Sequence, residues 1–335
     1  MARASEWFLR SGIQTPNGGV ARYYRVDLGR NQRVSTEITG YAASTFAFLD
    51  RREGARAAAR FLTSAWDRAA GAMPFEIEPA QFTYFFDCGI VVRGLLAVWR
   101  ATGDGELLEC ARLVGQSMAG DFRAPDGSFH PILSLPGKRP VERDPLRWSR
   151  SPGCYQLKAA MAWWDLWEAT GDACFRSLYE SMREEALRTA PDFLPGHAER
   201  RKVVDRLHAY LYFLEGLLPM PSAAIGDGIE RVAGILRELA PEFERSDVYA
   251  QLLRMRIYAD AAGAAKLDRA AAGWEAERLL EFAAAADDPR VDGGFYFGRS
   301  AGRWEPYINP VSTAFALQAL ALWSGAAPAD RHLLI

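Results

Sequence analysis

Acidic side chains stand near the starts of two apolar stretches of this 335-residue chain, at Glu37 and Asp87. Two carboxylates that face each other across the mouth of a site can divide acid and base roles once their surroundings separate their pKa values, as glycoside chemistry requires. Each could instead cap a helix or complement its N-terminal dipole. We therefore predict Glu37 and Asp87 as candidate catalytic carboxylates, with helix capping as the alternative.

A second candidate group surrounds His208 in an apolar stretch that begins at residue 203. Asp205 lies three residues earlier on the same helical face, where it could orient the imidazole ring and fix its tautomer. Tyr210 or Tyr212 could supply a second proton carrier, and a histidine–tyrosine pair suits proton abstraction next to a uronate carboxylate. The alternative is a core histidine with satisfied hydrogen bonds. We predict catalytic roles for His208 and Tyr210.

Three arginines near such stretches could bind a carboxylate by paired hydrogen bonds: Arg93, Arg147 and Arg150. Salt bridges to rim carboxylates are the alternative. Arg93 lies inside an apolar stretch, where some buried partner is nearly obligatory. Arg93 and Arg150 are the predicted carboxylate-binding residues.

Further polar and aromatic residues share this placement at the heads of apolar stretches, where they could bind or stack on a sugar ring. Aromatic residues at helical spacing are also common in plain cores. The predicted binding residues are Tyr41, Tyr84, Tyr155, Tyr307 and Asn309. Trp148 and Tyr296 are further stacking candidates, and Asp247 and Tyr249 mark another helix head.

An internal repeat indicates the elements that must position these residues. The segment 95–104, LLAVWRATGD, returns at 163–172 as WWDLWEATGD, and residues 317–323 repeat its apolar part. Each full copy reads as the end of an apolar helix, a glycine able to take the left-handed C′ position and an aspartate that caps the next helix. The repeat therefore predicts an array of helix pairs.

The rest of the chain continues this alternation of apolar and amphipathic stretches. Apolar helices are predicted at 37–49, 82–101, 153–169, 203–218, 247–262 and 310–323, and amphipathic helices at 3–11, 51–69, 104–119, 172–190, 223–239 and 265–286. Weak strand signals at 23–26 and 295–297 predict small rim hairpins. Twelve helices in inner and outer order imply a closed ring, because a ring buries the inner set without exposed ends.

Short motifs resemble the α/α-toroid superfamily. Trp7-Phe8-Leu9 followed by Gln14-x-x-x-Gly18-Gly19, with echoes at 126–129 and 292–295, is similar to its glutamine–glycine–aromatic repeats. The segments 37–41 (EITGY) and 86–89 (FDCG) resemble motifs of its glycan-associated bacterial branch, which includes glucuronyl C5-epimerases and unsaturated glucuronyl hydrolases. Terpene cyclases and protein prenyltransferases are more distant members. The resemblance implies an (α/α)6 toroid, and we predict a single all-α domain over residues 1–335.

Other classes of protein are disfavoured by what the sequence lacks. Basic and acidic residues balance, 40 against 42, without a basic block that would follow a phosphate backbone, so nucleic acid is an unexpected partner. No metal-ligand spacing joins the four cysteines, and D-D-x-x-D, Walker and H-E-x-x-H motifs are missing, so we expect neither a metal nor another cofactor. The lack of a signal-peptide core or an 18-residue apolar run predicts a cytoplasmic protein without a membrane span.

These residues together favour a carbohydrate-active protein that acts on an acidic, uronate-containing polysaccharide or oligosaccharide by hydrolysis, elimination or epimerisation. Glu37 or Asp87 would serve as the acid, His208 with a tyrosine as the base or proton carrier, and Arg93 or Arg150 as the carboxylate clamp. One alternative is a glycan-binding scaffold without catalysis. Another is an isoprenoid cyclase or prenyltransferase type of toroid, which the charged residues at the mouth disfavour.

Overall fold

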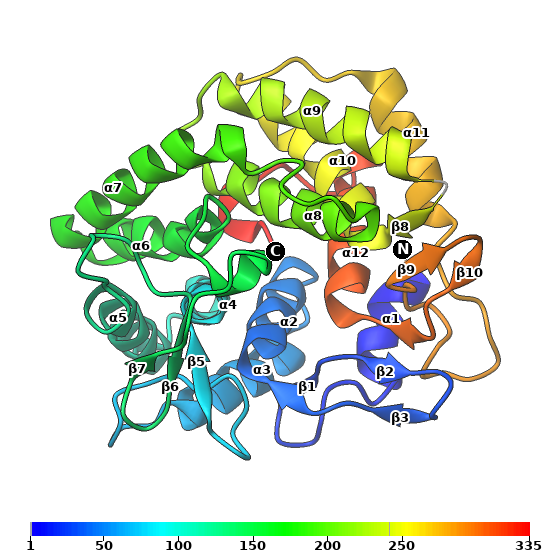
Figure 1. Ribbon diagram of the computed structural model, residues 1–335. Helices are drawn as coiled ribbons and strands as arrows, with labels where there is room; N and C mark the ends of the chain where they lie inside the picture. Colours follow the sequence, from blue (N-terminus) through cyan, green and yellow to red (C-terminus); the bar gives the residue numbers. More distant parts are fainter. Residues whose placement is uncertain (1, 241) are drawn as a thin grey trace. The chain divides into compact units, whose positions relative to one another are not determined.

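A computed structural model describes residues 2–240 and 242–335, and these residues form twelve α-helices (Figure 1). Their bounds are α1 Ala2–Arg10, α2 Thr36–Phe48, α3 Arg52–Ala65, α4 Phe85–Thr102, α5 Gly105–Gly120, α6 Gln156–Thr170, α7 Ala173–Thr189, α8 Arg200–Gly216, α9 Ala224–Leu239, α10 Ser246–Ala261, α11 Arg269–Leu280 and α12 Pro310–Trp323. Even-numbered helices are mostly buried, as the apolar pattern predicts. The predicted alternation of twelve helices is confirmed.

Short antiparallel strands lie between the helices. They are β1 Val20–Ala21, β2 Tyr24–Arg25, β3 Arg30–Asn31, β4 Val34–Ser35, β5 Phe82–Tyr84, β6 Ile132–Ser134, β7 Arg139–Pro140, β8 Phe243–Arg245, β9 Gly298–Ser300, β10 Arg303–Trp304 and β11 Tyr307–Ile308. They form the sheets β1-β4, β11-β2-β3, β5-β6-β7 and β10-β9-β8. The predicted hairpin at 23–26 contains β2, whereas residues 295 and 296 form only isolated bridges.

Contacts divide the chain into two compact units. Unit 1 comprises Met1–Gln14, Ala21–Gln32 and Asp192–Ile335, and unit 2 comprises Thr15–Val20 and Arg33–Pro191. In unit 2 the buried helices α2, α4 and α6 pack in sequence, each against its following partner α3, α5 or α7. In unit 1 α10 packs between α8 and α12, with α9, α11 and α1 as their partners. Each unit therefore holds three helix pairs, and the predicted single domain over 1–335 stays a prediction.

Small residues set the distance between buried helices. A Cβ atom added to Gly94 of α4 would lie 2.5 Å from the carbonyl oxygen of Gly40 in α2. Only a residue without a Cβ atom allows the two backbones to approach this closely. The crossing of α2 and α4 therefore depends on glycine at position 94.

The internal repeat has the predicted structure. Gly103 and Gly171 end α4 and α6 in the left-handed region, at φ values of 72° and 76°. The carboxylates of Asp104 and Asp172 then accept hydrogen bonds from backbone N–H groups in the first turn of the following helix, at 3.0 and 2.9 Å. Both copies are thus helix-to-helix hairpins with the same cap chemistry.

Two of the glycine turns noted in the sequence are also structurally equivalent. A Cβ atom on Gly18 would lie 2.1 Å from a carbonyl oxygen of α3, and one on Gly293 would lie 2.5 Å from a carbonyl oxygen of α1. Just after each turn, a backbone N–H donates to a threonine of the next buried helix, to Thr39 at 2.9 Å and to Thr313 at 3.0 Å. Each turn therefore joins an outer helix to the head of a buried one.

Two predicted helices differ in length from the observed ones. The stretch 82–101 begins its helix only at Phe85, because residues 82–84 pair with β6. The stretch 265–286 is helical only over α11, because Asp268 caps the helix by accepting from two backbone N–H groups at 3.0 Å and residue 283 forms a bridge with Phe295.

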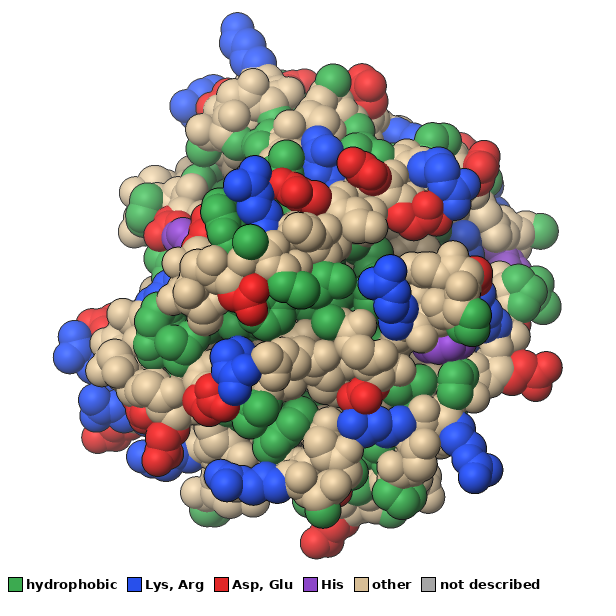
Figure 2. All heavy atoms as spheres, turned by 90° about the vertical axis from the view of Figure 1, so that its left-hand side faces the viewer, with side chains coloured by type: hydrophobic (Ala, Val, Ile, Leu, Met, Phe, Trp, Pro, Cys, Tyr) green, Lys and Arg blue, Asp and Glu red, His purple; other side chains and the backbone are tan. Residues whose placement is uncertain are grey.

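The surface carries both signs of charge. On the face shown in Figure 2, basic and acidic side chains are interspersed without a large field of one sign. Within the described residues, every helix is too short or too polar to cross a membrane.

Candidate functional site

Arg245 organises a cluster of charged side chains at the head of α10 in unit 1. It is the last residue of β8, and its guanidinium donates to both carboxylate oxygens of Asp247, at 2.9 and 2.6 Å, and to Asp205 of α8 at 2.7 Å. Burial is the largest influence on Asp247 and opposes its ionisation, yet the Arg245 charge, the His208 ring and the hydrogen bonds to this carboxylate together outweigh burial and lower its pKa. The cluster therefore holds two carboxylates and one guanidinium.

His208 of α8 lies beside this cluster and is 8% exposed. Its Nδ1 atom is 2.6 Å from Oε1 of Gln251 and 3.7 Å from Asp247 Oδ2, and its ring contacts Tyr212 at 4.4 Å between centroids. Burial lowers the pKa of His208 to about 4, and the negative charge of Asp247 offsets only part of this effect. The ring is therefore neutral at pH 7, and Nε2 takes part in no hydrogen bond with the described residues.

Aromatic rings line the same end of unit 1. The Arg245 guanidinium lies 4.5 Å above the Phe297 ring, which stacks on Tyr307 at 5.0 Å, and Tyr307 contacts Tyr23 at 5.0 Å. The strand pair β11-β2 brings this wall together, with Tyr307 opposite Arg25. Burial is the main cause of the raised pKa of the Tyr307 hydroxyl, which stays protonated at neutral pH.

Two other predicted residues of unit 1 lie apart from the His208 ring contacts. Tyr210 packs against Phe193 and Phe213, at 6.4 and 5.3 Å, and the Arg231 guanidinium of α9 lies 5.8 Å from its ring. Asn309 is the N-cap of α12 and accepts from the backbone N–H of Val311 at 2.8 Å. The tyrosine in contact with His208 is Tyr212, so the proton-carrier role of Tyr210 stays a prediction.

Unit 2 holds the two predicted carboxylates. Glu37 is half-buried in the first turn of α2, where Ser35 caps the helix by accepting from a backbone N–H at 3.3 Å. Asp87 is buried in the first turn of α4. Tyr41 is buried one turn beyond Glu37, and Tyr84, directly before α4, contacts an aromatic ring at 5.1 Å. Both carboxylates thus lie at helix heads, while their catalytic roles remain predictions.

Tyr155 lies close to Asp87 at the head of α6. Its hydroxyl donates to the backbone carbonyl of Ser151 at 3.1 Å, and its ring meets Trp148 edge to face at 4.9 Å. Burial raises the pKa of Tyr155, and the charge of Asp87 adds to the increase. Arg150, in the 3₁₀ turn Trp148–Arg150, is half-buried, and its guanidinium forms no ion pair with the described residues.

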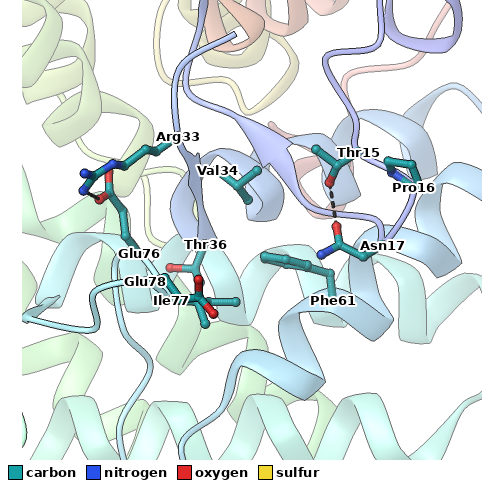
Figure 3. A pocket seen from close by; sticks show the side chains of 10 residues that line it. All are labelled: Thr15, Pro16, Asn17, Arg33, Val34, Thr36, Phe61, Glu76, Ile77 and Glu78. Atoms are coloured by element: carbon teal, nitrogen blue, oxygen red, sulfur yellow. Dashed lines mark hydrogen bonds and ion pairs between the residues drawn. The ribbon is translucent and has the colours of Figure 1, made fainter.

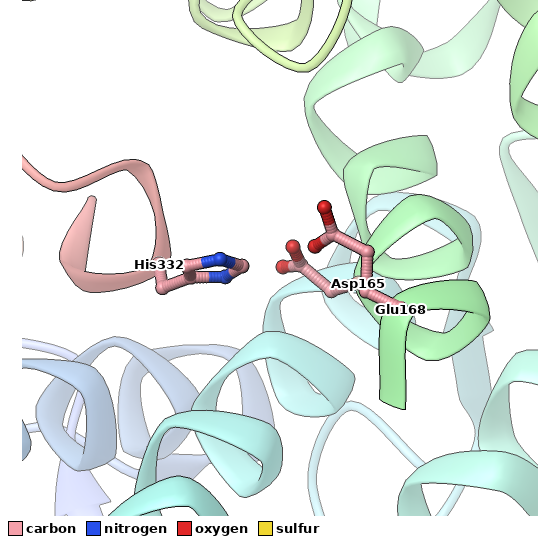
Figure 4. Close-up of side chains that lie close together, drawn as sticks. All are labelled: Asp165, Glu168 and His332. Carbon is pink, nitrogen blue, oxygen red and sulfur yellow. The ribbon is translucent and has the colours of Figure 1, made fainter. Parts of the chain in front are cut away.

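Arg93 has the buried partner that its apolar surroundings require. Its Nε donates to Asp165 of α6 at 3.0 Å, with only 5% and 1% of the two side chains exposed, and Arg100 lies 3.8 Å from the same carboxylate. Figure 4 shows Asp165 and Glu168 on neighbouring turns of α6. The Arg93–Asp165 pair joins α4 to α6, which is a structural role, and the clamp role of Arg93 stays a prediction.

A cavity of about 540 Å³ lies in unit 2 between the 15–17 turn, β4, α3 and the loop 76–78 (Figure 3). Its floor is apolar, with Val34 and Phe61, and Arg33 pairs with Glu76 at its edge at 3.3 Å. Thr15, within the same wall, donates to the nearby asparagine side chain at 2.6 Å. None of its ten lining residues is a predicted site residue.

Sequence reasoning missed part of the His208 cluster. Asp205 was expected to orient the ring, but it binds Arg245, and Gln251 and Asp247 occupy the positions beside Nδ1. Asp247 had been noted at a helix head without a role. The available signal was the spacing of Asp247 and Gln251, which places both side chains on one face of α10.

Comparisons with known proteins identify the fold. No protein-family model matches the chain, and no curated protein matches it. Solved structures with a similar fold include cellobiose 2-epimerase from Spirochaeta thermophila DSM 6192, with a TM-score of 0.70, 16% identity and 96% of both chains covered. A sugar epimerase from a ruminal bacterium gives 0.68 at 12% identity, covering 97% of this chain and 98% of that one. A D-mannose isomerase gives 0.66 at 10% identity, covering 97% of each. The chain has the all-α toroid fold of these enzymes, which confirms the predicted fold class.

Proposed function

We propose that the chain is a carbohydrate epimerase or isomerase in which His208 moves a proton at a carbon beside a carbonyl group. The observation that carries the proposal is that the buried His208 ring is neutral at pH 7. A neutral imidazole with Nδ1 bound to Gln251 at 2.6 Å keeps the Nε2 lone pair available as a base. The activities named for three enzymes of the same fold, two epimerases and an isomerase, support this reaction class.

The proposed chemistry balances without an oxidant or a reductant. Nε2 of His208 takes the proton from the carbon next to the carbonyl of an open-chain sugar, and the electron pair of the broken C–H bond forms an enediolate. A solvent proton delivered to the opposite face of this carbon gives the epimer, and His208 then releases the proton it took to solvent. Return of the His208 proton to the neighbouring carbon, with the hydroxyl proton passing to the former carbonyl oxygen, gives the isomer. Asp247, 3.7 Å from Nδ1, would stabilise the imidazolium while it carries the proton.

The charge beside His208 favours a neutral sugar as substrate. Asp205 and Asp247 together with Arg245 leave one net negative charge, and the three Arg245 nitrogens already donate to these carboxylates. An anionic uronate placed here would meet a repulsive field and an arginine whose donors already bind carboxylates. The aromatic wall of Phe297, Tyr307 and Tyr23 suits the apolar face of a neutral pyranose.

A uronate-containing substrate is the second candidate, supported by Arg150 in unit 2. Its half-buried guanidinium has no ion-pair partner among the described residues, and Trp148 in the same short turn contacts Tyr155. An arginine without an ion-pair partner among the described residues, in the same turn as a tryptophan, suits recognition of a sugar carboxylate. In this case Glu37 or Asp87 would provide the general acid.

Solvent deuterium exchange tests both candidates. The purified protein is incubated in D₂O with neutral sugars (cellobiose, glucose, mannose) and with glucuronate-containing oligosaccharides, and loss of the C2–H or C5–H signal is followed by proton NMR. We expect exchange at C2 of a neutral sugar. The change His208→Asn should slow it about 100-fold or more, because a positioned acid or base contributes this much.

Val203→Ala is the matched control, since it truncates a buried side chain on the same helix that has no role in the proposed chemistry. It should keep most of the exchange rate. Exchange that survives His208→Asn would refute the role of His208. Exchange at C5 of glucuronate alone, sensitive to an Arg150→Ala change, would favour the second candidate, and binding without any exchange would favour the glycan-binding scaffold.

A further inference from the structure

A network of hydrogen-bonded, buried polar side chains extends from His208 into the core of unit 1. Behind the 2.6 Å contact between His208 Nδ1 and Gln251 Oε1, the amide nitrogen of Gln251 faces Glu215 Oε1 at 3.4 Å. Arg254 donates to the same Glu215 oxygen through Nε at 2.9 Å. Gln251, Glu215 and Arg254 are all fully buried.

The hydrogen-bonded network continues from Arg254 to α12. Arg254 Nη1 donates to Gln318 of α12 at 3.3 Å, and the Arg254 guanidinium lies 3.7 Å above the Phe315 ring. Gln318 in turn donates to the backbone carbonyl of Leu333 at 2.6 Å and accepts from a nearby backbone N–H at 3.1 Å. Partners on two other helices thus bind Arg254 and fix the position of its guanidinium.

This arrangement permits only one orientation of the Gln251 amide. Arg254 donates to Glu215 through two nitrogens, as expected of an ionised carboxylate. A Gln251 amide turned by 180° would point its oxygen at this carboxylate and its NH₂ group at His208. With the oxygen facing His208 instead, both contacts are attractive, and Nδ1 must carry the hydrogen that Oε1 accepts.

We propose that Gln251 is a positioning residue that fixes His208 in the Nδ1–H tautomer, and that the Glu215–Arg254 pair fixes the orientation of Gln251. This inference rests on the proposed function for its catalytic consequence, because only the Nδ1–H tautomer leaves Nε2 as a base. The other tautomer would place a proton on Nε2 and would set the Nδ1 lone pair against the Gln251 oxygen. The charged groups around the ring are Asp247 and Arg245 at the head of α10 and Glu215 on α8.

The tautomer can be measured in the ligand-free protein by ¹⁵N NMR of labelled histidine, with His208→Asn used to assign the signals. The wild type should show a protonated Nδ1 and an unprotonated Nε2 at pH 7. Gln251→Leu should give a mixture of tautomers or mainly Nε2–H, with deuterium exchange slowed at least tenfold. Gln156→Leu is the matched control, since it removes a buried glutamine of unit 2 that donates to a backbone carbonyl outside this network, and it should leave the His208 tautomer unchanged.

A double variant that exchanges the two side chains, Gln251→Glu with Glu215→Gln, keeps the hydrogen-bonded network and should restore the Nδ1–H tautomer. Gln251→Glu alone places two carboxylates together and should restore it less well. If Gln251→Leu does not fold, Gln251→Asn replaces it, because the shorter side chain withdraws its oxygen from Nδ1.

A folded Gln251→Leu or Gln251→Asn protein that keeps a pure Nδ1–H tautomer would overturn the proposal. A tautomer that depends on Gln251 in a protein without exchange activity would support the positioning role while refuting the proposed function. The two failures are therefore distinguishable.

Discussion

Acidification should destabilise the protein through His208. Burial lowers the pKa of this histidine from 6.5 to about 4. Between these two values the unfolded state binds a proton that the folded state does not, so the free energy of unfolding decreases as the pH falls. The contribution is fully present above pH 6.5 and is lost as the pH decreases toward 4.

The size of the effect follows from the two pKa values. One pKa unit corresponds to about 1.4 kcal/mol, so lowering the pH from 7 to 5 should cost about 2 kcal/mol of stability through this one group. Other groups also titrate in this range. The effect of His208 is therefore isolated as a difference between the wild type and His208→Gln, in which Asp247, Arg245 and Glu215 are retained.

Urea unfolding at pH 7.0 and pH 5.0 gives the four free energies that this comparison needs. His208→Gln should lose about 2 kcal/mol less than the wild type between the two pH values. Val203→Ala, a buried truncation on the same helix, controls for destabilisation as such and should keep the wild-type pH dependence. An equal loss in the wild type and His208→Gln would show that the ring is not held neutral, and the reasoning about its base function would fail with it.

Two further changes test the packing of unit 2. Arg93→Met should lower the free energy of unfolding by about 3–5 kcal/mol, because the 1% exposed Asp165 loses its buried guanidinium partner. Denaturant unfolding measures this change. A near-neutral result together with weaker substrate binding would instead support the carboxylate-clamp role of Arg93. Gly94→Ala should also destabilise the protein. Its Cβ atom would lie 2.5 Å from the Gly40 carbonyl oxygen of α2, and the cost of this clash should exceed the ~1 kcal/mol that alanine gains in helix propensity. A stabilised Gly94→Ala protein would contradict the close approach of these helices.

The helix pattern was predictable because its causes are local. The two copies ending at Asp104 and Asp172 combine a left-handed glycine with an aspartate cap, and both features depend only on residues within one or two turns. The strands were harder to predict. Residues 82–84 join β6 about 50 residues later, a pairing that no local pattern specifies.

The candidate site residues also include some that the local sequence pattern identifies and partners that only the structure reveals. The sequence identified His208 as a residue of interest and required a buried partner for Arg93, because polar groups in apolar helices must be satisfied. It did not identify Asp165 as that partner, which lies 72 positions away. It also assigned the orientation of His208 to Asp205, the nearest acid on the same helix, whereas Asp205 binds Arg245.

By itself, the sequence determined the order of apolar and amphipathic helices, their caps and the toroid fold class, because periodicity and capping act over short distances along the chain. Only the tertiary structure decided which polar side chains meet. Gln251 and His208 are separated by 43 positions and lie on different helices, and their contact follows from the packing of α8 against α10. The rotation and height of each helix relative to its neighbour set such contacts, and these depend on the packing of all the buried side chains at once.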